Sequence, residues 1–157
     1  PTAGLHFDAS LMDTLRASGI DVLLRGLKTP LLGVCIGMQV LFERSEEGDV
    51  AGLGLLRGPV RKLPASPGIR MPHMGWNRLA RRVDSPLLDG IDEGAQACFV
   101  HSYGVIGSAD VIAETQHGSA FCAAGARDNI AGAQFHPERS GAVGARFLSN
   151  FLSWNPA

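Results

Sequence analysis

At residues 30–39 the chain reads Pro-Leu-Leu-Gly-Val-Cys-Ile-Gly-Met-Gln, which predicts a short buried strand, a sharp turn and a helix. The apolar run Leu31–Val34 is typical of a strand covered on both faces. Cys35 lies at the corner, two residues from Gly33 and from Gly37. This Gly-x-Cys-x-Gly spacing is that of a nucleophile elbow, in which a strained turn projects the reactive side chain clear of the sheet. Glycines allow the neighbouring backbone to come close.

The elbow predicts a nucleophilic thiol. A core role suits Cys98 and Cys122, which lie in apolar, strand-like runs, because free cysteines are among the most buried residues. For Cys35 the flanking glycines and the switch from strand to helix favour a reactive role. We expect the helix after Cys35 to direct its N-terminal amides at the sulfur and so to lower the pKa of the thiol.

Composition limits the domain count and the class of partner. The 157 residues, 45% of them hydrophobic, predict one globular domain over residues 1–157. A net charge of −1 supplies no basic field for nucleic acid or an anionic membrane. Three irregularly spaced cysteines argue against a disulfide framework and for a reducing compartment. Because no apolar run of membrane length appears either, we expect a cytoplasmic protein.

Helices are expected at both ends of the sequence and at the elbow. The first is capped by Asp8 or Ser10, and a short helical piece follows at residues 21–27. The elbow helix is expected to end near residues 43–45. A closing helix should extend from about Ser140, its cap, to about Trp154.

Strand-like runs separated by turn residues fill the middle of the chain. They span residues 53–63, 75–83, 97–103, 111–116, 120–124 and 130–135. Tight-turn signals at 117–118 and 128–129 predict two antiparallel hairpins. Together with the elbow strand, these runs predict an α/β domain with a mixed central sheet.

A base for Cys35 is expected at the end of the last strand-like run. The five histidines are His6, His73, His101, His117 and His136, and no two have the i,i+2 or i,i+4 spacing of a metal site. A thiolate nucleophile needs a base and a group that orients the base. His136 follows an apolar run, and Pro137 keeps it out of helical conformation. Glu138 lies on the same side in an extended chain and can fix the imidazole tautomer.

Two motifs resemble the signatures of the class I, triad-type glutamine amidotransferases. They are Gly-Val-Cys-Ile-Gly-Met-Gln at 33–39 and Gln-Phe-His-Pro-Glu-Arg-Ser at 134–140. Pro-His-Met-Gly-Trp-Asn at 72–77, Phe-Val-His-Ser-Tyr at 99–103 and the segment from Gly141 onward narrow the resemblance to the glutaminase subunits of imidazole glycerol phosphate synthase. The resemblance covers essentially the whole chain and implies a flavodoxin-like fold with a nucleophile elbow.

This resemblance implies a glutaminase that uses no cofactor and no metal. Cys35 attacks the side-chain amide of L-glutamine, His136 takes the thiol proton and returns it to the leaving ammonia, and Glu138 orients His136. Hydrolysis of the glutamyl thioester then gives glutamate. In the family, ammonia passes through a tunnel to a (β/α)8-barrel cyclase subunit, which forms imidazole glycerol phosphate in histidine biosynthesis.

The resemblance also implies roles for residues around the triad. The oxyanion donors are the backbone amides of Ile36 and Gly4. The residues expected to hold glutamine are Gln39, Glu43, His101, Ser102 and Tyr103. Trp76 and Arg139 are expected at the interface with the cyclase. From the residues alone, Glu43 is as readily a surface carboxylate and Trp76 as readily a core residue.

The sequence departs from the family at its start. Residues 1–4 read Pro-Thr-Ala-Gly where the family usually has Pro-Gly-x-Gly, and the β-branched Thr2 resists the positive φ that glycine permits. This opening, without an initiator Met, predicts an N-terminally truncated domain. Arg139 stands where Lys is common. Two alternatives stay open: the glutaminase of another enzyme, such as pyridoxal phosphate synthase, and a catalytically impaired docking module.

Overall fold

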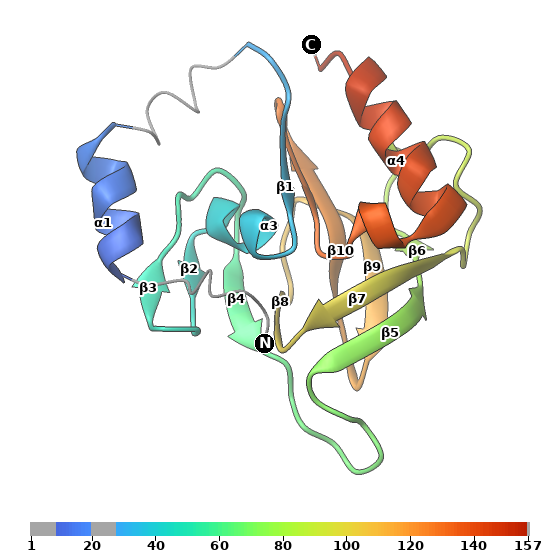
Figure 1. The fold of residues 1–157 in the computed structure, drawn as a ribbon, viewed down its shortest axis with the longest axis horizontal. Helices are drawn as coiled ribbons and strands as arrows, with labels where there is room; N and C mark the ends of the chain where they lie inside the picture. The colour runs from blue at the N-terminus through green and yellow to red at the C-terminus, as the bar shows by residue number, and fades with distance from the viewer. Residues whose placement is uncertain (1–8, 20–27, 157) are drawn as a thin grey trace.

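The computed structural model describes residues 9–19 and 28–156. Three sheets form its centre, and helices lie beside them (Figure 1). The helices are α1 (Ala9–Ala17), α3 (Ile36–Leu41) and α4 (Gly141–Ser153), with short 3-10 turns η1 (Pro86–Leu88) and η2 (Pro137–Arg139). The strands are β1 (Leu31–Val34), β2 (Arg44–Ser45), β3 (Val50–Ala51), β4 (Pro59–Lys62), β5 (His73–Arg78), β6 (Ala80–Arg81), β7 (Gln96–His101), β8 (Tyr103–Val105), β9 (Val111–His117), β10 (Ser119–Arg127) and β11 (Ile130–Ala133).

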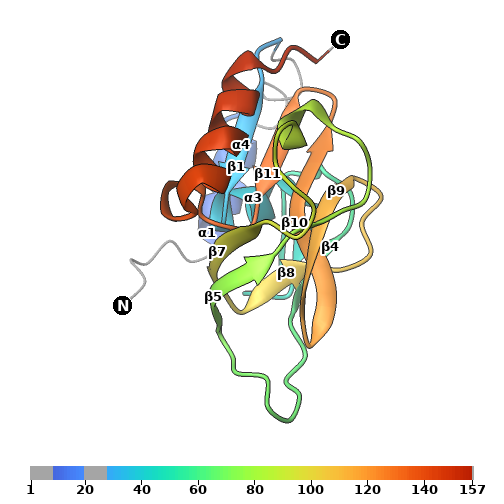
Figure 2. The ribbon, with the colours of Figure 1, turned by 90° about the vertical axis from the view of Figure 1, so that its right-hand side faces the viewer.

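The largest sheet is mixed, as the sequence predicted. Its strand order is β1-β11-β10-β9-β6, in which β1 pairs parallel with β11 and the other neighbours pair antiparallel. The predicted hairpins at 117–118 and 128–129 are confirmed as the β9–β10 and β10–β11 connections. A second sheet has the order β3-β2-β4-β8, and β5 pairs with β7 (Figures 1 and 2).

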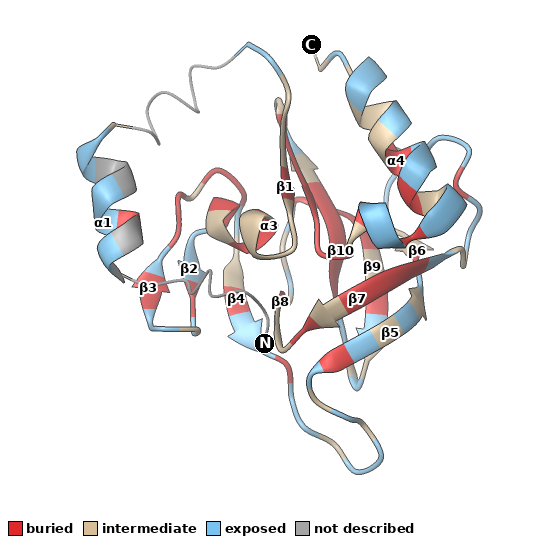
Figure 3. Ribbon diagram, viewed as in Figure 1, coloured by how far each residue is buried: buried red, intermediate tan, exposed pale blue. Residues whose placement is uncertain are grey.

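Two apolar clusters pack against the largest sheet. One contains Phe99, Phe135 and Phe147, and the other contains Met38 and Phe42. Phe121 on β10 belongs to the first cluster and the next residue, Cys122, to the second, as the alternation of side chains along a strand requires. The sheet therefore separates the two clusters, and the side of α4 turned away from it is exposed (Figure 3).

Helix α3 packs so closely against β1 and β11 that two positions on these strands have no room for a side chain. A Cβ on Gly33 would lie 2.5 Å from the Gly37 carbonyl oxygen, and one on Gly132 would lie 2.5 Å from Cγ of Met38. Real Cβ atoms do not come that close, so only glycine fits at either position. The elbow and the end of β11 are thereby held together.

Several predicted boundaries are corrected by tertiary contacts. The elbow helix ends at Leu41, because the amides of residues 53–56 take the carbonyls of Val40, Leu41 and Phe42. For the same reason the strand predicted at 53–63 is confined to β4. The first helix is confirmed as α1, but Ser10 lies inside it and is not its cap. Asp8 and the helical piece expected at 21–27 lie outside the described residues.

Candidate active site

Cys35 occupies a strained elbow at the carboxyl end of β1. Its backbone has φ 53° and ψ −114°, a conformation rare for a residue with a side chain. In the parallel register, Val34 lies opposite Ala133, and the Cys35 amide donates to the Ala133 carbonyl at 2.7 Å. Residues that follow β1 and β11 therefore meet at one edge of the sheet, where open α/β sheets bind ligands.

His136 is one of the polar residues that follow β11 at this edge. Its amide donates to the Cys98 carbonyl at 2.8 Å, and its backbone is extended, as expected before Pro137. The ring Nδ1 lies 2.8 Å from Oε1 of Glu138. The predicted contact forms, although Glu138 lies in the 3-10 turn η2 and not in extended chain. A carboxylate accepts only, so Nδ1 carries the proton and Nε2 is the basic nitrogen of neutral His136.

Ser140 holds the His136 backbone in place. Its hydroxyl donates to the His136 carbonyl at 2.7 Å and accepts from the Cys98 amide at 2.9 Å. Ser140 precedes α4, but its side chain makes no cap hydrogen bond, which corrects the prediction of a helix-capping hydroxyl. The buried hydroxyl instead ties η2 to β7.

The Cys35 sulfur is largely enclosed by polar backbone and side-chain groups. Sγ lies 3.9 Å from the Val100 carbonyl oxygen and 3.8 Å from Nε2 of Gln134. Burial raises the pKa of the thiol, the Ile36 backbone amide lowers it, and the carboxylates of Glu138 and Glu47 raise it further. The expectation of a lowered pKa is therefore wrong, because desolvation outweighs the amide at the start of α3.

Gln39 and Tyr103 meet beside this sulfur. The Gln39 side chain is 3% exposed, so it is not a solvated helix residue. Its Nε2 donates to the Tyr103 carbonyl at 2.8 Å and to Oε1 of Gln134 at 2.9 Å. The buried His101 ring contacts the same Tyr103 carbonyl through Nδ1 at 2.7 Å. The carbonyl of Ser102 accepts from the Leu63 amide, so it serves the link between β7 and β4.

Comparison with known proteins assigns the architecture around these residues. A family model described as "Glutamine amidotransferase class-I" matches residues 16–154. The chain belongs to the class-I glutamine amidotransferases. This membership confirms the fold class that the sequence predicted.

Relatives of this class-I glutamine amidotransferase include proteins named "Imidazole glycerol phosphate synthase subunit HisH". The one from Xanthomonas oryzae pv. oryzae (strain MAFF 311018) is 54% identical over 149 residues, which cover 95% of this chain and 74% of the relative. The one from Xylella fastidiosa (strain Temecula1 / ATCC 700964) is 55% identical over 138 residues, which cover 88% of this chain and 68% of the relative.

Solved structures agree on the fold. A putative GMP synthase protein from Thermoplasma acidophilum has a TM-score of 0.58 at 17% identity, with 96% of this chain and 68% of that chain covered. A structure titled "Crystal structure of glutamine amidotransferase" has a TM-score of 0.59 at 17% identity, with 88% of this chain and 71% of that chain covered. At this identity the likeness supports the class-I glutamine amidotransferase fold alone.

Two carboxylates behave differently from expectation in this class-I glutamine amidotransferase. Oε2 of Glu43 accepts from the Gly58 amide at 2.8 Å, so the Glu43 side chain holds the loop before β4. Glu47, which sequence reasoning did not single out, is half-buried and acts electrostatically on the Cys35 thiol. The acidic run at 46–49 carried no motif that separated Glu47 from its neighbours, so only the fold could identify it.

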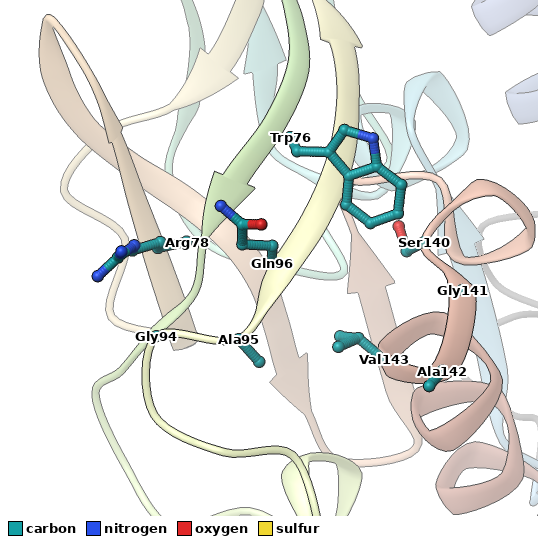
Figure 4. A pocket seen from close by; sticks show the side chains of 9 residues that line it. All are labelled: Trp76, Arg78, Gly94, Ala95, Gln96, Ser140, Gly141, Ala142 and Val143. Carbon is teal, nitrogen blue, oxygen red and sulfur yellow. The ribbon is translucent and has the colours of Figure 1, made fainter.

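The residues expected at a partner interface are on the surface. Trp76 is 56% exposed on β5, and Arg139 is exposed on η2. Trp76 therefore does not have the core role that the sequence left open. It borders a cavity of about 610 Å³ beside Ser140 and the start of α4 (Figure 4). Gly4, the second expected oxyanion donor, lies outside the described residues.

Within residues 9–19 and 28–156, no group of three or more His, Cys, Asp or Glu side chains is arranged to hold a metal ion. Among the described helices, none is long and apolar enough to cross a membrane. The three cysteines are free thiols.

Proposed function

We propose that this chain is the glutaminase subunit of an imidazole glycerol phosphate synthase. It hydrolyses L-glutamine to glutamate and supplies ammonia to a cyclase partner in histidine biosynthesis. The observation that supports the proposal most is the placement of Cys35 directly after β1 and of the hydrogen-bonded pair His136 and Glu138 shortly after β11, the parallel neighbour of β1. The names of the relatives supply the synthase and the pathway step.

The first half of the reaction is acyl transfer to sulfur. Nε2 of His136 removes the thiol proton as Sγ of Cys35 attacks the side-chain amide carbon of glutamine. The resulting oxyanion lies near the Ile36 amide, which already interacts with the sulfur. His136 then protonates the leaving nitrogen, the C–N bond breaks, and ammonia departs. The product on the enzyme is a glutamyl thioester.

The second half releases glutamate. His136 takes a proton from water, the hydroxide attacks the thioester carbonyl, and the C–S bond breaks. The proton returns to sulfur, which restores the Cys35 thiol. Glu138 keeps the Nδ1 proton of His136 in place through both halves, so the same tautomer serves as base and acid.

Glutamine recognition is assigned to the polar groups beside the thiol. Gln39 and His101 both contact the Tyr103 carbonyl, and Gln39 also contacts Gln134, the neighbour of the Cys35 sulfur. We propose that these groups hold the polar groups of the substrate. Glu43 stays a proposed partner of the substrate ammonium, and Glu47 is proposed as a second candidate because its charge acts on the Cys35 thiol. Gly4 stays the proposed second oxyanion donor.

The partner is proposed to be a (β/α)8-barrel cyclase that docks on the exposed β5 face. Trp76 offers a large aromatic surface of the kind that anchors interfaces, and Arg139 on η2 supplies a charge close to the triad. In this arrangement ammonia would pass directly from one active site to the other. The proposed domain is a single unit that works inside the cell without metal or cofactor.

The test is glutamate release from glutamine by the full chain, with and without the cyclase partner and its nucleotide substrate. We expect release to rise sharply only when both are present. Cys35→Ala should abolish release while the complex still forms. Cys122→Ala is the matched control, because Cys122 is a buried core thiol on β10 and should leave turnover unchanged.

The outcomes separate the alternatives. Turnover retained in Cys35→Ala would refute the assigned nucleophile. Recovery of a different synthase, such as pyridoxal phosphate synthase, in place of the cyclase would change the pathway while keeping the chemistry. A complex that forms normally but releases no glutamate would favour a docking module. Thr2→Gly, close to the proposed oxyanion donor Gly4, would then be the first variant to test.

A further inference from the structure

A buried line of hydrogen-bonded groups connects the Cys35 sulfur to strand β5. Its side chains are Gln134, Gln39, His101 and His73, with exposed fractions of 0%, 3%, 8% and 3%. Phe99 and Phe121 pack against the histidine rings. Polar groups are buried this deeply only when each finds a partner, so the orientation of every amide and ring in the line is determined by its neighbours.

The Tyr103 carbonyl fixes the direction of the line, because an oxygen of this kind only accepts hydrogen bonds. The group of Gln39 that lies 2.8 Å from it must be the NH2 group, which places the same nitrogen 2.9 Å from Gln134. The atom of Gln134 that meets this donor must then be its oxygen. The NH2 group of Gln134 is therefore left facing Sγ of Cys35, at 3.8 Å.

We infer that Gln134 is a further catalytic residue, whose amide N–H donates to the Cys35 sulfur and stabilises the thiolate as it forms. This inference rests on the proposed function for its role in turnover, but the contact itself is independent of the substrate. The carboxylates of Glu138 and Glu47 act on the sulfur and oppose the thiolate, and His136 is its proposed base. A fixed N–H donor offsets part of that opposition.

The far end of the line is fixed in the same way. Nδ1 of His101 donates to the Tyr103 carbonyl, so Nε2 accepts from Nδ1 of His73 at 3.2 Å. Nε2 of His73 then accepts from the amide nitrogen of Asn77 at 3.3 Å, whose own orientation is set because Oδ1 accepts from the Arg78 amide. Each member has one orientation compatible with its neighbours.

His101, His73 and Asn77 are thus positioning residues for Gln134. These three residues hold the Tyr103 carbonyl in place. The carbonyl orients the Gln39 side chain, and Gln39 in turn orients the Gln134 amide. The Asn77 nitrogen also donates to the Gln116 carbonyl at 2.8 Å, so the line ends on the backbone of β9. The line contains no acid or base that must change charge, and both histidines serve as neutral rings.

The decisive experiment measures the rate at which iodoacetamide alkylates Cys35 as a function of pH, by mass spectrometry on the folded full chain. Gln134→Met removes the donor, and Gln134→Glu replaces it with an acceptor. We expect alkylation at neutral pH to fall about tenfold in Gln134→Met, with the pH profile displaced by about one unit, and further in Gln134→Glu. Gln96→Met and Gln96→Glu, at an exposed position on β7 outside the line, are the matched controls and should match the parent chain.

Wild-type pH profiles in both folded Gln134 variants would overturn the inference. Should those variants fail to fold, His101→Phe supplies the test, because the ring packing is retained while the hold on the Tyr103 carbonyl is lost. It should shift the alkylation profile in the same direction, and an unshifted profile would overturn the inference equally. Alkylation needs no glutamine turnover, so loss of glutaminase activity in the parent chain would count against the proposed function alone.

The histidine orientations have their own readout. Long-range proton–nitrogen NMR of the 15N-histidine-labelled chain should show His73 and His101 as neutral rings protonated at Nδ1. A ring protonated at Nε2 at either position would break the line of hydrogen bonds and refute the positioning role. Asn77→Asp, which replaces the donor with an acceptor, should displace this pattern, whereas Asn77→Ala should leave the tautomer of His101 in place.

Discussion

Acid should destabilise this fold through its two buried histidines. Burial, together with the neighbouring His117, lowers the pKa of His73 from an ordinary value of 6.5 to about 4. Burial also lowers the pKa of His101 to about 3, although its hydrogen bond to the Tyr103 carbonyl opposes the shift. The unfolded chain therefore binds more protons than the folded chain between these values and 6.5, so stability falls as pH decreases through that window. From pH 7.5 to pH 5 each ring should cost about 2 kcal/mol, and the pair about 4 kcal/mol.

The assay is urea denaturation of the full chain at several pH values between 5 and 7.5, with the free energy of unfolding compared across variants. His101→Phe keeps ring contacts with Phe121 and Phe99 but cannot take a proton. It should be less stable than the parent at neutral pH, because hydrogen bonds are lost, yet its acid-induced loss should be smaller by about 2 kcal/mol. A pH dependence identical to that of the parent would refute the reasoning, and His73→Phe tests the second ring in the same way.

Three further predictions concern packing and charge. A Cβ on Gly144 would lie 1.8 Å from the Pro137 carbonyl oxygen, so Gly144→Ala should cost about 1–3 kcal/mol, and an unchanged melting temperature would show that α4 does not pack tightly on η2. Burial raises the pKa of Asp110, but the hydrogen bonds and charge of Arg57 outweigh it and lower the pKa overall. The ionised Asp110 carboxylate therefore stabilises the fold above the pKa that Asp110 has in the unfolded chain, and this stabilisation is lost in acid. Asp110→Asn should have a lower melting temperature than the parent at pH 7 and approach the parent as pH falls. A difference in melting temperature that stays constant with pH would contradict this. Ser140→Ala should lower kcat more than it raises KM and cost about 1 kcal/mol of stability, with Ser140→Thr restoring kcat.

The elements that build the site could be predicted because their signals are local. Gly33 and Gly37 around Cys35 mark the elbow within five residues, and His136-Pro137-Glu138 carries its own conformational constraint through proline. The hairpins at 117–118 and 128–129 are equally local. Each of these signals depends on residues that are close together in the chain, so no long-range pairing had to be known.

What could not be predicted depends on contacts between distant segments. The early end of α3 follows from amides contributed by residues 53–56, and the pairing of His73 with His101 follows from the β5–β7 register. Neither register nor capping from a remote loop is encoded in periodicity. The prediction of a lowered pKa for Cys35 was wrong for the same reason. The start of a helix next to Cys35 could be predicted from the local sequence, whereas burial of the thiol by the rest of the fold could not.

The protonation state of Cys35 decides how the proposed chemistry begins. Cysteine has an ordinary pKa of about 8.5, and here burial and two carboxylates raise it, so the sulfur is mainly a thiol at neutral pH. In the proposed chemistry a thiol loses its proton as it attacks, and Nε2 of His136 is the proposed base that takes it. The N–H groups of Ile36 and Gln134 then meet negative charge that exists only once the reaction has started. Hydrogen-bond donors placed where negative charge develops accelerate the step more than they stabilise the resting state. A thiol in the resting state is also less susceptible to oxidation than a thiolate.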